Sequence, residues 1–303
     1  MSLTSTMFTG VSGLLNQAEA MNVIGNNISN VNTLGFKGSR MLFSDVLSTS
    51  VGSQSVGQLG HGVQIQKVDT VFAQSSLETT TSPTDVAVQG ANFFVVAKPG
   101  TTTAGSITSP ADAFYTRAGA FRVDSNRALI TPDNYNVLDS NSDPIVFPLN
   151  DSTGLLTFQK VSSISAKGEI ALLYSDATGN SSTEYYNGNG VPSVTTIPAA
   201  VAPASSGVRT LGTAKIPNPP GMEKIGGSLF RQTGTITGGS GTPVIGGQNG
   251  TTESILANNL ELSNVDMANE FVKMILTQRA YSANSKTITT SDEMTQEILN
   301  LKR

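Results

Sequence analysis

The chain has 303 residues and a formal net charge of −4, and only 13% of its residues are charged, against ~25% in ordinary soluble domains. The acidic balance and the lack of a basic stripe exclude a nucleic-acid-binding surface, and the absence of cysteine excludes disulfides, thiolate metal sites and cysteine nucleophiles. A chain of this length is expected to form two or more structural units.

The first predicted element is an N-terminal helix with a coiled-coil seam. Its seam positions are spaced alternately by four and three residues, which is the heptad pattern. Ala18 and Gly25 permit close approach but bury little area, so the helix needs a partner for stability. The seam consists of Met7, Val11, Leu14, Ala18, Met21, Gly25 and Ile28.

This helix ends in a stretch rich in asparagine, NNISNVNTLGFK (26–37). Asparagine tolerates the left-handed conformation and its amide competes for backbone groups, so it favours helix ends and turns. The stretch predicts the exit of the helix into an extended arm or linker over residues 32–70. Its key residues are Asn26, Asn27, Asn30, Asn32, Gly35 and Phe36.

The middle of the chain has the period-two alternation of β-strands, separated by Gly, Pro, Asn and Asp. It predicts an all-β unit of barrel or sandwich type without a helix of its own. Polar stretches at 44–62, 176–208 and 233–251 are expected to form an extended segment, an exposed excursion and a loop, respectively. The predicted strands cover 63–68, 85–90, 92–98, 114–124, 126–131 and 210–216, with a hairpin at 163–175 that turns near Lys167-Gly168.

A second long helix is predicted from a cap at Ser263 or Asn264 almost to Arg303, since no Gly or Pro interrupts it. Two apolar lines on this helix imply more than one partner. We therefore expect the terminal helices to pair with each other as a coiled coil and then with neighbouring copies; the alternative is that both cover the core of one globular domain. The seam consists of Val272, Leu276, Ala280, Ala283, Thr287, Ser291, Met294, Ile298 and Leu301, and the second line of Phe271, Ile275 and Tyr281.

The sequence does not indicate an enzyme, a cofactor or a metal site. His61 is the only histidine and lies between two glycines, so we interpret it as a loop residue. The stretch DSNSDP (139–144) begins like a calcium-binding loop, but Pro144 and Asn150 stand where that loop needs Gly and Glu, so it predicts a turn. The glycine clusters at 238–247 lack the Lys-Ser/Thr ending of a phosphate-binding loop.

The N-terminus lacks the charged region of a signal peptide, and no apolar run reaches the ~18 residues that span a bilayer. Membrane insertion is therefore not expected. These rules predict a cytoplasmic chain, unless it leaves the cell by a route that uses no cleaved signal.

Four stretches of the chain resemble, in the same order, signature sequences of the bacterial flagellar rod and hook proteins. They lie at both ends and in the middle of the chain, and they identify it as a member of that axial protein family. The stretches are SGLLNQAEAMNVIGNNISNVNTLGFK (12–37), VAVQGANFFVV (86–96), YTRAGAFRVDSNRALIT (115–131) and SNVDMANEFVKMILTQRAYSANSKTITTSDEMTQEILNLKR (263–303).

Within the family, LTSTMFTGVSGLLNQ, VIGNNISNVNT and EILNLKR are most similar to hook proteins. The resemblance thus implies a structural subunit of the flagellar hook, a self-assembling helical tube that acts as a universal joint and transmits motor torque to the filament. A distal-rod subunit of the same family is the alternative, and a carbohydrate-binding β-protein is a distant one. The chain departs from hook proteins in its short centre, where residues 151–205 leave room for only a reduced outer β-insertion.

The resemblance also implies an architecture for the subunit. Residues 1–31 and 258–303 would form the helical coiled coil, and residues 71–150 with 206–257 would form the inner β-domain. The asparagine run would mark the point where the inner helix continues into an arm between neighbours, with its amides bonded to the backbone of other subunits.

By the same resemblance, the subunit is exported unfolded by the flagellar type III apparatus and polymerises with copies of itself. Its other expected partners are rod proteins, hook–filament junction proteins, the hook cap and the export apparatus. Its expected location is extracellular, in the basal body and hook of the flagellum, which it reaches without a cleaved signal peptide, and motility is the process it serves.

Overall fold

The fold is described from a computed structural model of the chain. Its contacts divide the chain into two compact units: a helical unit of Met1–Asn32, Lys37–Val71 and Val265–Arg303, and a β unit of Thr33–Phe36 and Phe72–Asn264. The structure describes residues 3–46, 49–50, 58–100, 102–103, 106–107, 113–176, 178–188, 208–233, 244–246 and 253–301.

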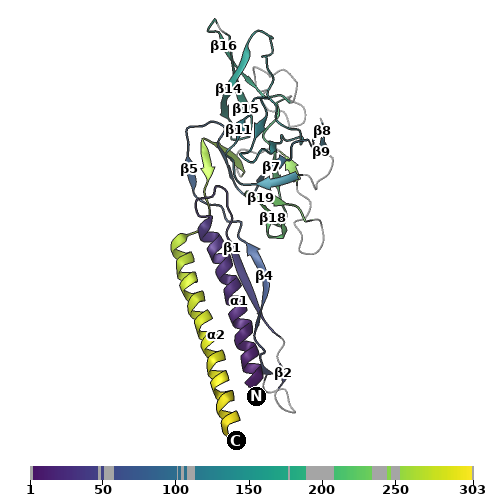
Figure 1. The fold of residues 1–303 in the computed structure, drawn as a ribbon. Helices are drawn as coiled ribbons and strands as arrows, with labels where there is room; N and C mark the ends of the chain where they lie inside the picture. Colours follow the sequence, from purple (N-terminus) through teal and green to yellow (C-terminus); the bar gives the residue numbers. More distant parts are fainter. Residues whose placement is uncertain are drawn as a thin grey trace. The chain divides into compact units, whose positions relative to one another are not determined.

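Two long helices, α1 (Leu3–Ser29) and α2 (Met267–Leu301), form the helical unit and contact each other. They run antiparallel, as the purple and yellow helices of Figure 1 show. Strands β1 (Ser39–Asp45) and β4 (Val63–Thr70) form an antiparallel pair that contacts α1. Two shorter strands, β2 (Thr49–Ser50) and β3 (Gln58–Leu59), also pair with each other.

The N-cap of α2 is Asp266, and not Ser263 or Asn264 as the sequence predicts. The Asp266 carboxylate accepts the backbone N–H groups of the second and third residues that follow it, which satisfies donors that a helix start leaves open. The two predicted residues are used elsewhere, because the Ser263 carbonyl and the Asn264 amide bond to the chain at residues 73–75.

The β unit is organised around strand β7 (Phe93–Ala97), which is fully buried. Strand β10 (Ala113–Thr116) pairs with one edge of β7, and β13 (Asn136–Val137) and β17 (Thr213–Lys215) pair along the other. Successive side chains of a strand point to opposite faces, so β7 supplies two separate hydrophobic cores. Phe94 and Val96 enter the larger core, and Phe93, Val95 and Ala97 enter the smaller one.

A second, three-stranded sheet consists of β14 (Thr157–Ile164), β15 (Ile170–Ser175) and β16 (Ser181–Tyr185). Gly168 adopts φ +85° in the β14–β15 connection, which confirms the predicted turn. The other elements of the β unit are β5 (Leu77–Thr79), β6 (Val86–Gln89), β8 (Thr102–Thr103), β9 (Ser106–Ile107), β11 (Arg122–Val123), β12 (Leu129–Ile130), the 3₁₀ helix η2 (Pro219–Gly221), β18 (Glu223–Gly226), β19 (Leu229–Arg231), β20 (Val244–Gly246), β21 (Ser254–Ala257) and β22 (Asn259–Glu261).

The predicted fold class is confirmed in its main features: the protein is mainly β, with one helix at each end of the chain. The predicted barrel or sandwich is not confirmed. The largest sheet has nine strands in an open order from β11 to β18, so no sheet among the described residues closes on itself. Neither helix in the described ranges is long and apolar enough to cross a membrane.

Two of the three polar stretches differ from their prediction. The expected excursion at 176–208 contains β16, and the expected loop at 233–251 contains β20. The expected extended segment at 44–62 contains β2 and β3, which are themselves extended. Residues 47–48, 51–57, 189–207, 234–243 and 247–252 lie outside the described residues.

Replacing Phe94 by alanine is expected to lower the free energy of unfolding by about 3–5 kcal/mol. The Phe94 ring is fully buried and packs edge-on against Phe121, with 5.1 Å between the ring centroids. Urea denaturation of the full chain measures the change. The control is Leu155→Ala, since Leu155 is 78% exposed and its truncation should change stability by less than about 0.5 kcal/mol. Equal effects of the two variants would contradict the description of the core.

Candidate assembly surface

The two helices approach closely where α1 carries glycine. A Cβ atom added at Gly10 would lie 2.9 Å from Ile288 Cγ1, and one added at Gly13 would lie 2.6 Å from Asn284 Nδ2. Real Cβ atoms do not come this near to other atoms, so a larger residue at either position would force the facing side chain of α2 to move. At these two positions the backbone of α1 therefore lies directly against side chains of α2.

The buried face of α1 is not the predicted seam. Most of its residues lie one position before a predicted seam residue, and one residue corresponds to a rotation of about 100° around a helix with 3.6 residues per turn. The predicted Val11 is exposed, and Met7, Leu14, Ala18, Met21 and Ile28 are only half-buried. The buried residues are Gly10, Gly13, Asn16, Ala20, Ile24 and Asn27.

Two asparagine amides on this buried face hold the β1–β4 pair against α1. Asn16 Nδ2 donates to the Val63 carbonyl at 2.6 Å. Asn27 Nδ2 donates to the Ser39 carbonyl at 2.7 Å, and Asn27 Oδ1 accepts the Ser39 N–H at 2.9 Å. Buried backbone groups need such partners, so the amides provide both stability and register.

Asn27 also connects α1 to α2. Its Nδ2 donates to Glu270 Oε2 at 3.1 Å, and Glu270 is almost fully buried. The other oxygen of Glu270 accepts Lys273 Nζ. One amide thus joins three elements, α1, β1 and α2. This differs from our expectation that the Asn27 amide bonds to the backbone of other subunits.

The rest of the asparagine motif is divided between the two units. Asn30 Nδ2 donates to the Asn26 carbonyl, and Asn26 and Asn32 are exposed in the helical unit. Gly35 and Phe36 belong to the β unit. Gly35 has φ +64°, and the Phe36 ring lies 4.8 Å from Lys224 Nζ.

The face that α2 buries is polar. Glu270, Thr277, Asn284 and Ser291 recur every seven residues, and all but the half-buried Asn284 are buried. Of the predicted seam, only Ser291 is buried, and Ala280 is half-buried. A heptad of polar residues is visible in the sequence, but a search for apolar seams does not detect it.

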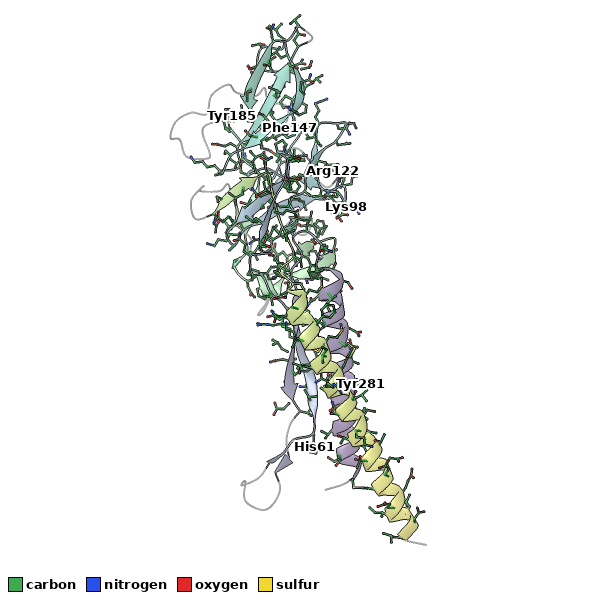
Figure 2. All side chains as sticks on the ribbon, turned by 90° about the vertical axis from the view of Figure 1, so that its left-hand side faces the viewer. His61, Lys98, Arg122, Phe147, Tyr185 and Tyr281 are labelled. Atoms are coloured by element: carbon green, nitrogen blue, oxygen red, sulfur yellow. The ribbon has the colours of Figure 1, made fainter. Side chains whose placement is uncertain are left out.

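Many large apolar side chains of both helices remain exposed. Figure 2 shows side chains standing out along the length of α2, with Tyr281 labelled. Exposed fractions reach 73% for Phe8 on α1 and 86% for Leu301 on α2. We call these side chains the outer apolar faces. On α1 they are Phe8, Val11 and Leu15, and on α2 Met267, Phe271, Val272, Ile275, Leu276, Met294, Ile298, Leu299 and Leu301. The predicted Ala283 and Thr287 are exposed as well.

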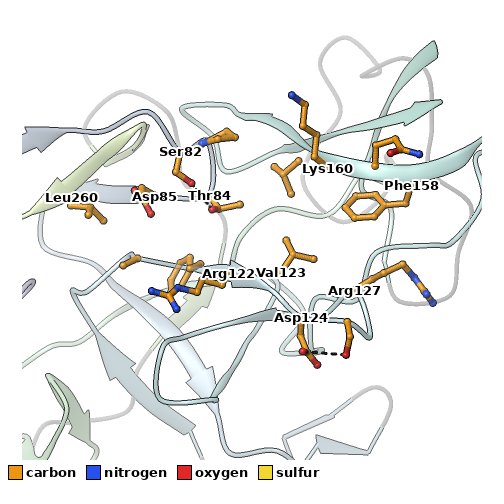
Figure 3. A pocket seen from close by; sticks show the side chains of 16 residues that line it. Ser82, Thr84, Asp85, Arg122, Val123, Asp124, Arg127, Phe158, Lys160 and Leu260 are labelled. Carbon is orange, nitrogen blue, oxygen red and sulfur yellow. Dashed lines mark hydrogen bonds between the residues drawn. The ribbon is translucent and has the colours of Figure 1, made fainter. Parts of the chain in front are cut away.

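A groove of about 920 Å³ lies in the β unit between β11, β14 and the turn at 82–85. Figure 3 shows Phe158 and Lys160 on one side of it, and Arg122 and Val123 on the other. No histidine lines the groove. Asp124 accepts hydrogen bonds from its neighbours Ser125 and Asn126, so it acts as a turn residue. The groove shows no arrangement of nucleophile and base.

The sequence DSNSDP forms the predicted turn, and the positive charge beside its two aspartates comes from the side chain of Arg209. Asp139 Oδ1 accepts the N–H groups of Asn141 and Asp143 at 2.8 and 2.9 Å. Arg209 Nη1 lies 2.9 Å from Asp139 Oδ2 and also bonds to Asp143. The hydrogen bond that Arg209 donates to Asp139 raises the pKa of Arg209. Across the described ranges, no group of three or more acidic, His or Cys side chains is arranged to hold a metal ion.

Alanine at Gly13 and at Gly25 should act in opposite directions. No atom lies within 4 Å of a Cβ built at Gly25, so Gly25→Ala should stabilise α1 by up to about 1 kcal/mol through helix propensity. Gly13→Ala should lower stability, because Asn284 has to move. Thermal unfolding followed by circular dichroism at 222 nm measures both. A gain of stability at Gly13 equal to that at Gly25 would contradict the close helix contact.

Asn27→Ala should destabilise the helical unit by about 1–3 kcal/mol, since it leaves buried polar groups of Ser39 and Glu270 without their partner. The matched control is Asn32→Ala, at an exposed position of the same motif. Amide hydrogen exchange of β1 reports the change directly. If both variants exchange at the same rate as the parent protein, the amide has no structural role.

Three family descriptions match successive parts of the sequence. Residues 7–37 match the flagella basal body rod protein family, residues 87–172 the D1 domain of the flagellar hook proteins FlgE/F/G, and residues 256–301 the C-terminal region of the flagellar basal body rod FlgEFG proteins. The matches cover both helices and the centre of the β unit.

Individual relatives align over almost the whole chain. The flagellar basal-body rod protein FlgG of Bacillus subtilis is 32% identical over 308 positions, covering 98% of this chain and 99% of the relative. FlgG of Borreliella burgdorferi is 32% identical over 310 positions, with 98% of each chain covered. The flagellar hook protein FlgE of the same organism is 26% identical over 457 positions, covering 98% of this chain and 99% of the relative. The chain belongs to the flagellar basal-body rod and hook protein family.

Proposed function

We propose that the protein is a rod subunit of the flagellar basal body, which polymerises with copies of itself into a straight drive shaft. This proposal replaces the hook subunit that the signature sequences imply. Relatives named as rod proteins align over about the length of this chain. The hook relative needs 457 aligned positions, far more than the 303 residues present here. The short centre of the chain therefore supports a rod subunit.

The observation that carries self-assembly is the pair of outer apolar faces. The helices contact each other and the β1–β4 pair through other faces. The side chains of the outer apolar faces therefore stay exposed to solvent in the free chain. Burying one Val, Leu, Ile or Phe side chain contributes about 1.5–3 kcal/mol. Contiguous exposed apolar side chains on a protein surface mark interaction sites. We infer that helices of neighbouring copies cover them.

The geometry of such contacts favours an open polymer. The outer faces of α1 and α2 consist of different residues, so a copy that binds one face leaves its own second face available. Head-to-tail contacts of this kind generate helical filaments when the rotation does not close a ring. In this arrangement α1 and α2, which lie within the predicted terminal segments 1–31 and 258–303, form the polymer core. The predicted inner β-domain, 71–150 with 206–257, and the reduced insertion 151–205 surround it. The predicted linker, residues 32–70, adds the β1–β4 pair to the helical unit.

The composition supports export in an unfolded state before assembly. A chain without cysteine carries no disulfide that must be opened. The glycine-containing α1–α2 contact buries little apolar area, so the helical unit is marginal until neighbours pack on it. We propose the flagellar export apparatus as the first partner, followed by copies of this chain and the adjoining rod and hook proteins. As a structural subunit, it carries out no catalysis in this scheme.

Electron microscopy of polymers assembled from the purified chain distinguishes rod from hook. Straight tubes are expected, and curved tubes would restore the hook interpretation. Limited proteolysis of the dilute chain should cleave the helices first, and polymerisation should protect them. A chain that forms no polymer at any salt or protein concentration would exclude both functions.

The double variant Leu276→Gln/Ile298→Gln should abolish polymerisation and leave the melting temperature of the free chain unchanged. Both side chains lie on the outer apolar face of α2 and are more than half exposed, so their loss removes contacts made only between copies. Thr290→Gln/Asn300→Gln is the control, at exposed polar positions of the same helix. Light scattering measures assembly. Normal assembly of the first variant would refute the role of this face.

A further inference from the structure

The chain passes between the two units at four points: 32/33, 36/37, 71/72 and 264/265. In the β unit, three segments adjoin these points. They are Thr33–Phe36, the residues that follow Phe72, and the residues that precede Asn264. Any force or motion that passes along the backbone between the units has to enter through these segments.

Glu261, in the third of these segments, bonds to both of the others. Its backbone carbonyl accepts the Gly35 N–H at 2.8 Å. Its carboxylate Oε1 accepts the Ser75 N–H at 3.0 Å. Glu261 itself ends β22, three residues before the last crossing, and its side chain is fully buried. One residue therefore links every segment by which the chain enters or leaves the β unit, through its carbonyl on one side and its carboxylate on the other.

A buried arginine fixes this carboxylate. Arg117 Nη1 lies 3.3 Å from Glu261 Oε2, and only 3% of the Arg117 side chain is exposed. The guanidinium also donates to the Gly90 carbonyl at 2.7 Å and lies 4.8 Å from the centre of the Phe93 ring. A buried charge is tolerated only when it is paired. Removing either Arg117 or Glu261 would leave the charge of the other unpaired in an apolar interior.

The same turn explains the glycine of the asparagine motif. A Cβ atom at Gly35 would lie 2.4 Å from the backbone nitrogen of Ala118, next to Arg117. Gly35 also has a positive φ, which other residues rarely adopt. Thr33–Phe36 can therefore lie against the Arg117–Ala118 turn only with glycine at this position.

The helical unit has a corresponding arrangement around Glu270. Its carboxylate accepts Asn27 Nδ2, and Asn27 exchanges two hydrogen bonds with Ser39. Val71 N–H donates to the Gly38 carbonyl at 2.8 Å. These residues lie within a few positions of the four crossings, on the helical side. In each unit, the residues next to the crossings are therefore hydrogen-bonded around one buried glutamate, Glu261 in the β unit and Glu270 in the helical unit.

We propose that Glu261 and Glu270 act as two clamps that confine flexing of the chain to the few residues between them. The clamps leave the four crossings, 32/33, 36/37, 71/72 and 264/265, as a joint with fixed ends. The two carboxylates are nine residues apart in the chain, on either side of the last crossing. This device belongs to the free subunit and does not depend on polymerisation.

Hydrogen–deuterium exchange of the full-length, unpolymerised chain tests the proposal. Glu261→Gln removes the charge and keeps the shape. It should accelerate exchange by roughly tenfold or more in residues 33–36, 72–76 and 259–264 together, while β15 remains unchanged. Glu270→Gln should act in the same way on the end of α1, the start of β1 and the start of α2, and should leave the β unit unaffected.

The matched control is Asp139→Asn, which removes an equally buried carboxylate paired with Arg209 in the same unit. Its effect should be confined to residues 139–143 and 208–211. The proposal is overturned if Glu261→Gln accelerates only one of the three segments, or if the control accelerates them as much. Should Glu261→Gln fail to fold, Arg117→Lys keeps the charge and loses the guanidinium geometry. Exchange in all three segments must then rise together, and an unchanged pattern would refute the clamp.

Discussion

The close contact of α1 and α2 at Gly10 and Gly13 decides what the helical unit presents to its surroundings. Glycine backbone and polar side chains make much of this contact, with Ile288 facing Gly10, so it uses few of the large apolar side chains of either helix. Those side chains stay on the outer apolar faces, where neighbouring copies can bury them. A seam of leucine residues would reverse this order: it would stabilise the isolated pair and leave a polar exterior with little tendency to polymerise.

Hydrogen bonds from side-chain amides hold the segments of the helical unit together, whereas apolar packing holds the β unit together. Asn16 and Asn27 fix the β1–β4 pair on α1 through backbone groups, whereas β7 stabilises the β unit by sending side chains into two cores. Hydrogen bonds contribute less per group than buried apolar area. We therefore expect the helical unit to be the less stable part, which fits the proposal that the subunit is exported unfolded and completes its packing on assembly.

Some of the buried charges lie where the chain connects its two units, and others, such as Asp139, Asp151 and Glu184, lie within the β unit. Glu261, Glu270 and Arg117 are among the few ionisable side chains with almost no exposure. Desolvation lowers the pKa of Arg117, and the neighbouring Glu261 opposes that shift. Charges of this kind are costly to bury, and hydrophobic residues of the same size would stabilise a core as well. Their geometric specificity provides the reason for their position: the Glu261 carboxylate accepts the Ser75 N–H and pairs with Arg117, and the Glu270 carboxylate accepts Asn27 Nδ2.

The sequence by itself determined the two terminal helices, the central strands and the protein family, because periodicity and signature stretches are local properties of the chain. Short strands such as β21, which pairs with β6 from more than 160 residues away, carry no such pattern and arise only from long-range pairing. The tertiary structure also decided which helix face is buried. Periodicity marks a stripe by hydrophobicity, but Gly10, Gly13 and Asn27 are selected by close approach and by hydrogen bonds to other segments. These contacts exist only in the folded chain. The buried face of α1 therefore lies about one residue away from the face that its apolar pattern predicts.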